Sequence, residues 1–302
     1  DGSRFTTQRS RSLAEAFGVP TGGFCPQISV STLFDVTSKV PLDVSVSRTP
    51  ADERGELIEE HLELLGEGDV VVLDRGYPSF EVLCYLEGSG AHWAVRVPVK
   101  SGFPAVTNFV ASGVTDRDIE ITVPAEYRAR DVPPLRARAV RIDRTEGEPI
   151  VVLTSLPRER FDVAQIQELY HLRWGVEEYY KLTKAEYLTS HSFHARNPEG
   201  VEQEVYSVAL FVSITRHLMA AAAAENDVPY EQVGQKRSML AVADHLLELL
   251  LLGDASELLE LISKLAREIT DRLEPRRPGR RHPRRRLRPQ PKWTAHGRRG
   301  GT

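Results

Sequence analysis

Two neighbouring stretches near the start of the chain alternate between apolar and polar residues. They are Gln27–Thr37 (QISVSTLFDVT) and Val40–Ser47 (VPLDVSVS). A period of two residues is typical of β-strands with one buried face, and the short gap between the stretches predicts a connecting turn. The next residues, from Pro50 to Gly66, have apolar side chains at helical spacing, which predicts a helix between the proline and the glycine.

The apolar runs that follow are shorter and unbroken. Asp69–Asp74 (DVVVLD) has the composition of a strand that is covered on both faces. Pro78–Glu87 predicts a second helix, and His92–Val99 (HWAVRVPV) another strand. The order strand, strand, helix, strand, helix, strand predicts an α/β fold, a mixed sheet flanked by helices.

The segment from Lys100 to Gly147 interrupts this order. It has short strand-like pieces separated by proline and glycine, such as Asp118–Val123 and Arg136–Ile142, and predicts a β-rich insertion. A buried strand at Pro149–Leu156 then resumes the core, and Asp162 is the expected N-cap of a long helix.

Three further helices are expected at about 200–225, 233–252 and 255–273. The predicted organisation is therefore a core in two parts around the insertion, followed by helices and a tail. In chain order these are residues 1–99, 100–148, 149–225, 226–274 and 275–302.

The composition is that of an ordinary soluble globular protein. The 302 residues are 41% hydrophobic and 27% charged. Cys25 and Cys84 form neither a disulfide framework nor a metal-binding spacing, so we expect a cytoplasmic protein. The chain does not open on a signal peptide, and Arg216 and His217 interrupt its longest apolar run, Val205–Ala224. We therefore expect a buried helix there and no membrane partner.

The charge is distributed unevenly. From Pro275 onward there are eleven Lys or Arg residues and no acid, so the preceding residues carry 28 basic against 43 acidic side chains. Such a Pro/Arg-rich tail is expected to be disordered. It is either a merely solvated terminus or, as we favour, a segment that binds nucleic acid through phosphate contacts.

One stretch, YHLRWGVEEYYKLTK, places four polar groups on one helix face. At about 100° per residue, Tyr170, Arg173, Glu177 and Lys184 fall within an arc of about 60°, whereas Glu178 points elsewhere. Ion pairs that merely support the helix would be one explanation, although each contributes only about 0.2–0.5 kcal/mol. The other explanation is a carboxylate that binds a hard cation beside cations that bind phosphate.

Two further acids complete a candidate set with Glu177. Asp74 ends its strand before Arg75, where α/β proteins often place a site, although it might instead cap the next helix. Asp1 begins the sequence in Asp-Gly-Ser, which alone is only a turn signal. Three carboxylates with few nearby His or Cys residues suit Mg²⁺ or Mn²⁺. Two such ions would support an in-line phosphoryl displacement.

The spacing Tyr170-x2-Arg173-x3-Glu177-x6-Lys184 resembles the Y-R-E-K signature of DDE transposases of the insertion-sequence-four type. The segments DGSRF and LDRGYPSFEVL resemble those that carry the first and second aspartates of that family. The similarity extends over nearly the whole chain. It implies a ribonuclease H-like fold with the β-rich insertion placed before the glutamate-bearing helix.

The resemblance also implies the roles of these residues. Asp1, Asp74 and Glu177 correspond to the catalytic, metal-binding triad, which takes two Mg²⁺ or Mn²⁺ ions. The other three members of the signature correspond to residues that contact DNA. The implied activity is nicking of double-stranded DNA at the terminal inverted repeats, followed by joining of the 3′-hydroxyl to target DNA. A homodimer in the synaptic complex is expected.

One departure from the family concerns Asp1. In the family an upstream region and a strand precede this residue, whereas here it is the first of the chain. We therefore expect Asp1 to be held loosely and this polypeptide to be a poor catalyst, because a preorganised site tolerates displacements of only about 0.5 Å.

Other polar residues have two explanations each. Arg75 would contact DNA near the site, or would form a local ion pair. Arg96 would also contact DNA, or would be a strand residue whose charge is exposed to water. His191 and His194 have the spacing of a metal pair, but no third ligand is near them in sequence, and we do not expect a metal there.

Two alternatives to a transposase remain open. One is a ribonuclease H-like nuclease that cuts DNA without strand transfer. The other is a catalytically inactive transposase remnant that binds DNA through the signature cations and the Arg-rich tail. A glycosidase that uses Asp74 and Glu177 is far less favoured, because it leaves Arg173 and Lys184 without a role.

Overall fold

A computed structural model describes residues 1–100, 102–130, 132–144, 147–187 and 193–275. The strands are β1 (Gly2–Thr6), β2 (Gln27–Asp35), β3 (Val40–Arg48), β4 (Val70–Leu73), β5 (His92–Val97), β6 (Asp116–Ile121), β7 (Leu135–Ile142) and β8 (Ile150–Thr154). The α-helices are α1 (Arg11–Phe17), α2 (Glu53–Glu56), α3 (Phe80–Gly88), α4 (Pro104–Ala111), α5 (Val163–Leu172), α6 (Trp174–Leu182), α7 (Pro198–Glu225), α8 (Gln235–Leu251) and α9 (Ala255–Thr270). Short π-helical turns are η1 (Leu57–His61) and η4 (Thr183–Tyr187), and short 3-10 turns are η2 (Leu62–Leu64), η3 (Ala125–Arg130) and η6 (Tyr230–Gln232).

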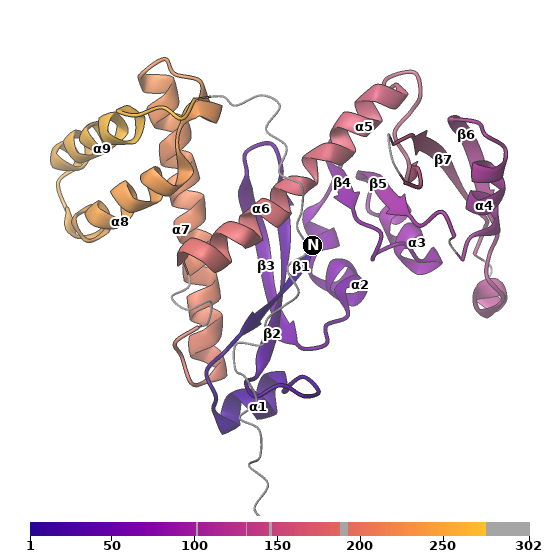
Figure 1. The fold of residues 1–302 in the computed structure, drawn as a ribbon, viewed down its shortest axis with the longest axis horizontal. Helices are drawn as coiled ribbons and strands as arrows, with labels where there is room; N and C mark the ends of the chain where they lie inside the picture. Colours follow the sequence, from indigo (N-terminus) through magenta and orange to yellow (C-terminus); the bar gives the residue numbers. More distant parts are fainter. Residues whose placement is uncertain (101, 131, 145–146, 188–192, 276–302) are drawn as a thin grey trace, which may run out of the picture.

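The strands form two sheets that lie side by side (Figure 1). The first is antiparallel, with the order β1-β2-β3. The second is mixed, with the order β4-β5-β8-β7-β6, in which β4 and β5 are parallel and the other neighbours are antiparallel. The fold is therefore a mixed α/β arrangement, as predicted.

Helices cover both faces of the five-stranded sheet. On one face α3 and α4 pack through Leu83 and Phe109 against Trp93 of β5. On the other face α5 contributes Ile166 and Tyr170, which pack against the alternate residues of β5, β7 and β8. The unbroken apolar runs seen in the sequence are those of strands buried on both sides.

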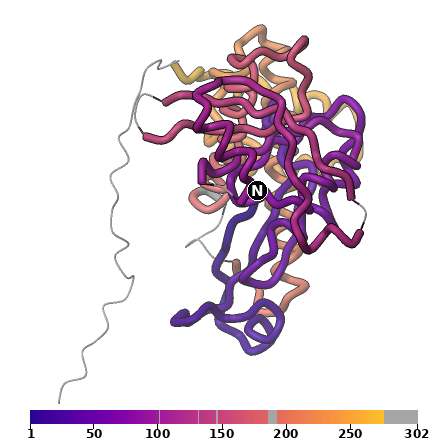
Figure 2. The backbone as a smooth tube through the Cα atoms, turned by 90° about the vertical axis from the view of Figure 1, so that its right-hand side faces the viewer, coloured from indigo at the N-terminus to yellow at the C-terminus, as the bar shows by residue number. Residues whose placement is uncertain are grey.

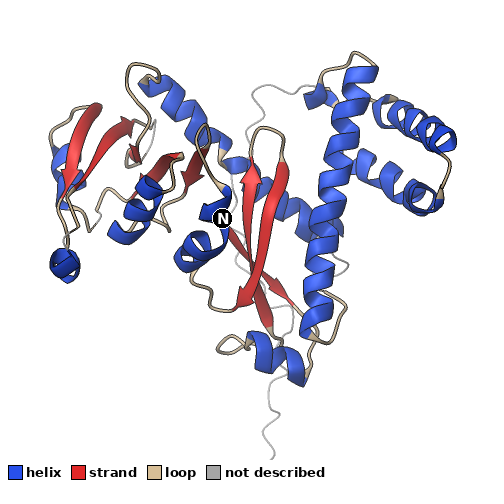
Figure 3. Cartoon of the chain, turned by 180° about the vertical axis from the view of Figure 1, so that it is seen from behind, coloured by secondary structure: helices blue, strands red, loops and turns tan. Residues whose placement is uncertain are grey.

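The three-stranded sheet packs against α1, α6 and α7. Ile28 and Val30 of β2 contact a cluster that includes Tyr180 of α6 and Val205 of α7. In Figure 3, α7 runs along this sheet, and α8 and α9 lie on the far side of α7. Helices α5 and α6 thus join the two sheets, since α5 packs on the second and α6 on the first.

Helix α7 is long and apolar enough, by length and composition, to be a candidate membrane span. One face of it is buried at Val201, Val205 and Val212, and its later residues contact α8 and α9. A core helix of a folded domain can have the same length and composition, and this one candidate within the described residues is weak evidence for a span.

Most of the predicted elements are confirmed, and Asp162 is the N-cap of α5 in a capping box with Gln165. The start of the chain, for which no element is predicted above, contains β1 and α1. Two predictions about local structure are wrong. The insertion contains the helix α4 in addition to strands. The long helix is interrupted at Arg173, which ends α5 and precedes α6.

The segment 100–148 is not separate from the sheet. Its strands β6 and β7 extend the five-stranded sheet, because β7 pairs with β8. The proposed boundaries between parts of the chain remain predictions. The expected disordered tail and His191 lie outside the described residues.

Candidate active site

Asp1 is held at the beginning of β1. Its nitrogen donates to the Thr32 carbonyl oxygen at 3.2 Å, and its carbonyl oxygen accepts from the Thr32 amide at 2.9 Å. The buried Tyr180 hydroxyl lies 2.6 Å from the same carbonyl oxygen. The expectation that Asp1 would be held loosely is therefore wrong, since pairing with β2 and contact with α6 fix its backbone.

Asp74 follows β4 directly. Its Oδ1 accepts a 2.7 Å hydrogen bond from the Gly76 amide, an Asx-type turn that closes the loop after the strand. The N-cap of α3 is Ser79, whose hydroxyl accepts from Val82, so Asp74 does not cap that helix. The strand places Asp74 at the edge of the five-stranded sheet, half-buried.

Glu177 comes from the first turn of α6 and forms an ion pair with Arg173. The Arg173 guanidinium donates to Glu177 Oε1 at 2.7 Å and to Asp1 Oδ2 at 3.3 Å. Burial of Arg173 favours its neutral form, but the hydrogen bond to Glu177 and the charge of Asp74 raise its pKa above the ordinary value. Arg173 is thus a fixed cation between two of the predicted carboxylates.

The three carboxylates line one open cavity of about 680 Å³ together with Lys184. They come from β1, the end of β4 and α6, which are distant in the sequence. Glu178, by contrast, lines a different cavity beside Gly175. The predicted face of Glu177 is therefore confirmed, although η4 rather than a continuous α-helix carries Lys184.

Lys184 borders the same cavity in a half-buried setting. Its Nζ donates to Ser3 Oγ at 2.6 Å and lies 4.8 Å from the centre of the Phe5 ring. Burial lowers its pKa from the usual value. A cation at the border of this cavity would attract a phosphate in it.

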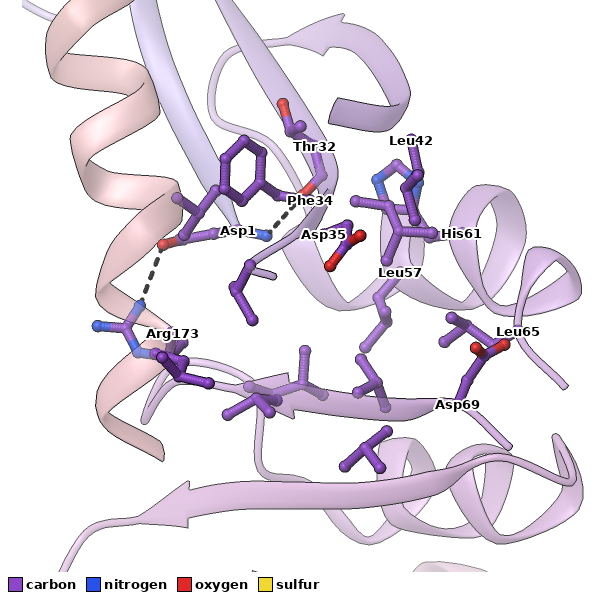
Figure 4. Close-up of a pocket in the computed structure, with 18 of the residues that line it drawn as sticks. Asp1, Thr32, Phe34, Asp35, Leu42, Leu57, His61, Leu65, Asp69 and Arg173 are labelled. Carbon is purple, nitrogen blue, oxygen red and sulfur yellow. Dashed lines mark hydrogen bonds and ion pairs between the residues drawn. The ribbon is translucent and has the colours of Figure 1, made fainter. Parts of the chain in front are cut away.

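A second cavity of about 430 Å³ adjoins the site between the two sheets. Figure 4 shows Asp1 and Arg173 at one end of it and apolar side chains such as Leu57 and Leu65 further along. Asp74 lines both cavities, so it lies where they meet.

The donor set suits a hard divalent cation in its chemistry, because all three side chains offer carboxylate oxygens. In the described part of the chain, however, no three Asp, Glu, His or Cys side chains are grouped closely enough to hold one ion. Arg173 contacts two of the three carboxylates. A cation would therefore bind with a change in the contacts of Arg173.

The other predicted site residues lie around this centre. Tyr170 is 9% exposed, packs in the α5 cluster, and its ring is 5.8 Å from the Arg173 guanidinium carbon. Arg96 follows Val95, the partner of Leu73, and so lies beside Asp74 in the sheet register. Arg75 is exposed and borders a third cavity, which shares no lining residue with the cavity of the three acids.

Sequence reasoning missed Glu53, the first residue of α2. A Cβ built on Gly2 would lie 2.9 Å from Glu53 Oε1, and a Cβ on Gly76 would lie 3.8 Å from Oε2. Its carboxylate thus lies beside the glycines that follow Asp1 and Asp74. The glycines in Asp-Gly and Asp-Arg-Gly were the available signal, because glycine often marks a close approach of another group.

Helix α2 is fixed by the turn that follows it. The buried His61 of η1 hydrogen-bonds Ser31 of β2 at 2.9 Å and Asp43 of β3 at 2.7 Å. Ser31 and His61 are at most 2% exposed, so this Ser-His-Asp arrangement anchors the turn to the sheet.

Comparison with known proteins gives one family. A family model described as "Transposase DDE domain" matches residues 1–214. The transposase InsG for insertion sequence element IS4 of Escherichia coli (strain K12) is 26% identical over 202 residues, which cover 64% of this chain and 44% of that protein. The chain thus spans less than half of the length of this relative.

A structural comparison matches a cryo-EM structure of the piggyBac transposase synaptic complex with hairpin DNA. The TM-score is 0.49 at 11% identity, over 88% of this chain and 56% of that one.

Proposed function

The chain belongs to the transposase DDE domain family, and on that basis we propose that it is the catalytic domain of a DNA transposase with a ribonuclease H-like core. The observation that carries this proposal is the meeting of Asp1, Asp74 and Glu177 in one cavity. Three elements distant in sequence bring these acids together, and the family match includes all of them.

Asp1, Asp74 and Glu177 would hold two Mg²⁺ or Mn²⁺ ions in this proposal. When bound, the ions supply the positive charge that activates the attacking oxygen and stabilises the leaving oxygen in an in-line displacement. The amides of Gly2 and Gly76 orient the aspartates, since each donates to the Oδ1 atom of its carboxylate at 2.9 and 2.7 Å.

The proposed reaction has two phosphoryl transfers. In the first, water attacks the phosphodiester at the element end, the P–O3′ bond breaks, and a 3′-hydroxyl is released. In the second, that hydroxyl attacks a phosphodiester of target DNA and displaces its 3′ oxygen. Lys184 would bind phosphate oxygens beside the acids, and Arg173 would do so once released from Asp1 and Glu177.

A second candidate, an inactive remnant that only binds DNA, is favoured by one observation. Arg173 pairs with two of the three acids. Among the described residues, no three Asp, Glu, His or Cys side chains are close enough together to bind one ion. In that case the cavity would bind phosphate through Arg173 and Lys184 without cleavage.

Cleavage of end-labelled duplex DNA that carries the element's terminal inverted repeats, in Mg²⁺ or Mn²⁺, tests the proposal. Glu177→Gln and Asp74→Asn are expected to reduce nicking by two orders of magnitude or more, because the lost charge acts on the transition state. Glu178→Gln is the matched control, since the neighbouring glutamate lines a different cavity.

Each outcome distinguishes between the candidates. Equal nicking by the Glu177 and Glu178 variants would contradict the proposed site. Cut ends without joined target products would indicate a nuclease without strand transfer. DNA binding without any nicking, unchanged in Glu177→Gln, would favour the inactive remnant.

A further inference from the structure

A basic groove includes Arg75, the residue after Asp74, and shares no lining residue with the cavity of the three acids. It has a volume of about 630 Å³. Its charged lining residues are Arg54, Arg75, Lys100, Arg128 and Glu126. We propose that this groove, which we call the α3–α4 groove, binds the phosphates of the DNA strand that passes over Asp74. The inference rests on the proposed function and deepens it, since it assigns a path for the DNA beyond the acids.

The charge of the groove is unusual for this chain. Four cations and one acid line it, although the residues before the tail are acidic as a whole. Within the described residues, the ion pairs of this part of the chain include those of Arg136 with Glu120 and of Arg138 and Arg158 with Asp116, and none of the ion pairs includes Arg75, Lys100 or Arg128. All three are exposed. Cations that carry no counter-charge and converge on one groove are suited to phosphates, which release condensed counterions on binding.

The groove is connected to the candidate active site through the backbone. Arg75 directly follows Asp74, and the Arg54 Nε donates to the Gly76 carbonyl oxygen at 3.0 Å. Glu53, the neighbour of Arg54, lies against Gly2 on the side of the acids. A strand with one phosphate at the acids would therefore have its next phosphates within reach of the groove.

Two helices begin at the groove, which adds to its preference for anions. Ser79 and Phe80 at the start of α3 line it, as do Phe103 and Pro104 at the start of α4. Helix N-termini carry partial positive charge, which favours phosphate. Tyr127 also lines the groove, with its ring centre 5.4 Å from that of Phe80 and 5.5 Å from the guanidinium carbon of Arg130.

The proposal gives a role to the segment 100–148. Lys100, Arg128, Tyr127 and the start of α4 all belong to this segment, whereas Arg54 and Arg75 belong to the core. The groove is thus built jointly, and the segment that extends the five-stranded sheet contributes half of its cations.

A pair of triple variants tests the groove in the full chain. The groove variant is Arg75→Ala, Lys100→Ala, Arg128→Ala. The control, Arg9→Ala, Arg11→Ala, Arg196→Ala, removes the same charge from exposed residues. The control residues Arg9 and Arg11 lie at the α1 end, which projects away from α4 in both Figure 1 and Figure 2. Both variants keep the basic tail, so its contribution to binding is constant.

Binding of a fluorescein-labelled 30-base-pair duplex is measured by anisotropy at several salt concentrations. Because each lost phosphate contact lowers the slope of log K against log salt by about 0.9, the groove variant should lose about 2–3 from the slope. Its affinity should fall about tenfold or more, and the control should change by less than about twofold. Equal losses in the two variants would overturn the proposal.

Photo-crosslinking gives a second measurement that does not remove charge. A photoreactive phenylalanine analogue at Tyr127 is expected to crosslink to the duplex, whereas the same analogue at the exposed Tyr206 of α7 is not. Crosslinking at Tyr206 alone would contradict the groove, even if the triple variant did not fold.

The two proposals fail in distinguishable ways. If the groove variant nicks and binds as well as the control while Glu177→Gln does not nick, the groove is wrong and the proposed function stands. If the wild-type chain never nicks but the groove variant binds weakly, the groove stands as a DNA site and the proposed function fails.

Discussion

Strand β2 of the three-stranded sheet buries hydroxyl groups, whereas β5 of the five-stranded sheet buries hydrocarbon. Ser29, Ser31 and Thr32 of β2 are at most 2% exposed, and so are Trp93 and Val95 of β5. Both sheets lead to the candidate active site, since β2 pairs with Asp1 and β5 pairs with the strand that ends at Asp74. The two aspartates are therefore positioned by different physical means.

This difference determines how each half responds to change. Apolar packing is not directional, so the five-stranded sheet can adjust slightly while Asp74 remains at the edge. Hydrogen bonds are directional and costly to leave unmade, so the buried hydroxyls around Asp1 specify one arrangement. We expect the five-stranded half to determine stability and the three-stranded half to determine the geometry of the acids.

The largest expected effect is on stability. Leu83→Ala removes a fully buried side chain from the α3 side of the five-stranded sheet, and should lower the free energy of unfolding by about 2–5 kcal/mol. Urea unfolding measures this. Leu64→Ala, at a position 54% exposed, is the control and should have little effect. A small change in the free energy of unfolding of Leu83→Ala would contradict the expectation that the five-stranded half determines stability.

Tyr180→Phe probes the polar half. The hydroxyl lies 2.9 Å from both the Val30 carbonyl oxygen and Thr32 Oγ1, in addition to its contact with Asp1. Its loss removes one buried donor that these oxygens share and should cost about 1–3 kcal/mol. If nicking is observed, it should fall by more than in Leu83→Ala, measured per folded molecule.

The exposed Tyr206 provides the control for this variant, as Tyr206→Phe. Unchanged nicking in Tyr180→Phe, together with reduced nicking in Leu83→Ala, would contradict the expectation that the three-stranded half determines the geometry of the acids.

The smallest expected effect depends on pH. It concerns Glu56, the last residue of α2. Burial raises the pKa of Glu56 above its usual 4.5, and the nearby charges of Glu53 and Asp52 add to this effect. Between its usual and its raised pKa the folded state binds more protons, so stability falls as pH rises through this range. Glu56→Gln should therefore be more stable than wild type at pH 7.

Unfolding midpoints between pH 4 and pH 8 measure this difference, which should shrink as pH falls from the raised pKa of Glu56 towards 4.5 and be absent below that value. Both carboxylate oxygens are buried, but the residue as a whole is only partly buried, so solvent screening keeps the gain below about 1 kcal/mol. Glu59→Gln on the exposed side of the same turn is the control. A gain that persists unchanged at low pH would contradict the explanation.

Elements with strong local signals were predictable from the sequence, and others were not. Asp162 and Gln165 form a capping box that is visible in the sequence, and the apolar run before Asp74 is the strand β4. The helix α4 was missed because its residues PAVTNFVA are rich in side chains that favour strands. Packing of Val106 and Phe109 against the sheet overrides that preference.

The candidate site was predictable in its residues but not in their contacts. The spacing of Glu177 and Lys184 placed both on one face, and both line the same cavity. The pairing of Arg173 with Asp1 joins residues 172 positions apart, which local periodicity does not reveal. Glu53 has no local signal of its own, since only the fold brings it beside Gly2.

The pairing of Arg173 with both Asp1 and Glu177 has a consequence for the charge of the candidate site. The negative charges of neighbouring carboxylates repel one another. The Arg173 guanidinium reduces this repulsion, because it pairs with both Asp1 and Glu177. Under the proposed function, a bound cation would replace the guanidinium as the counter-charge of Asp1 and Glu177, and Arg173 would then be able to bind an incoming phosphate.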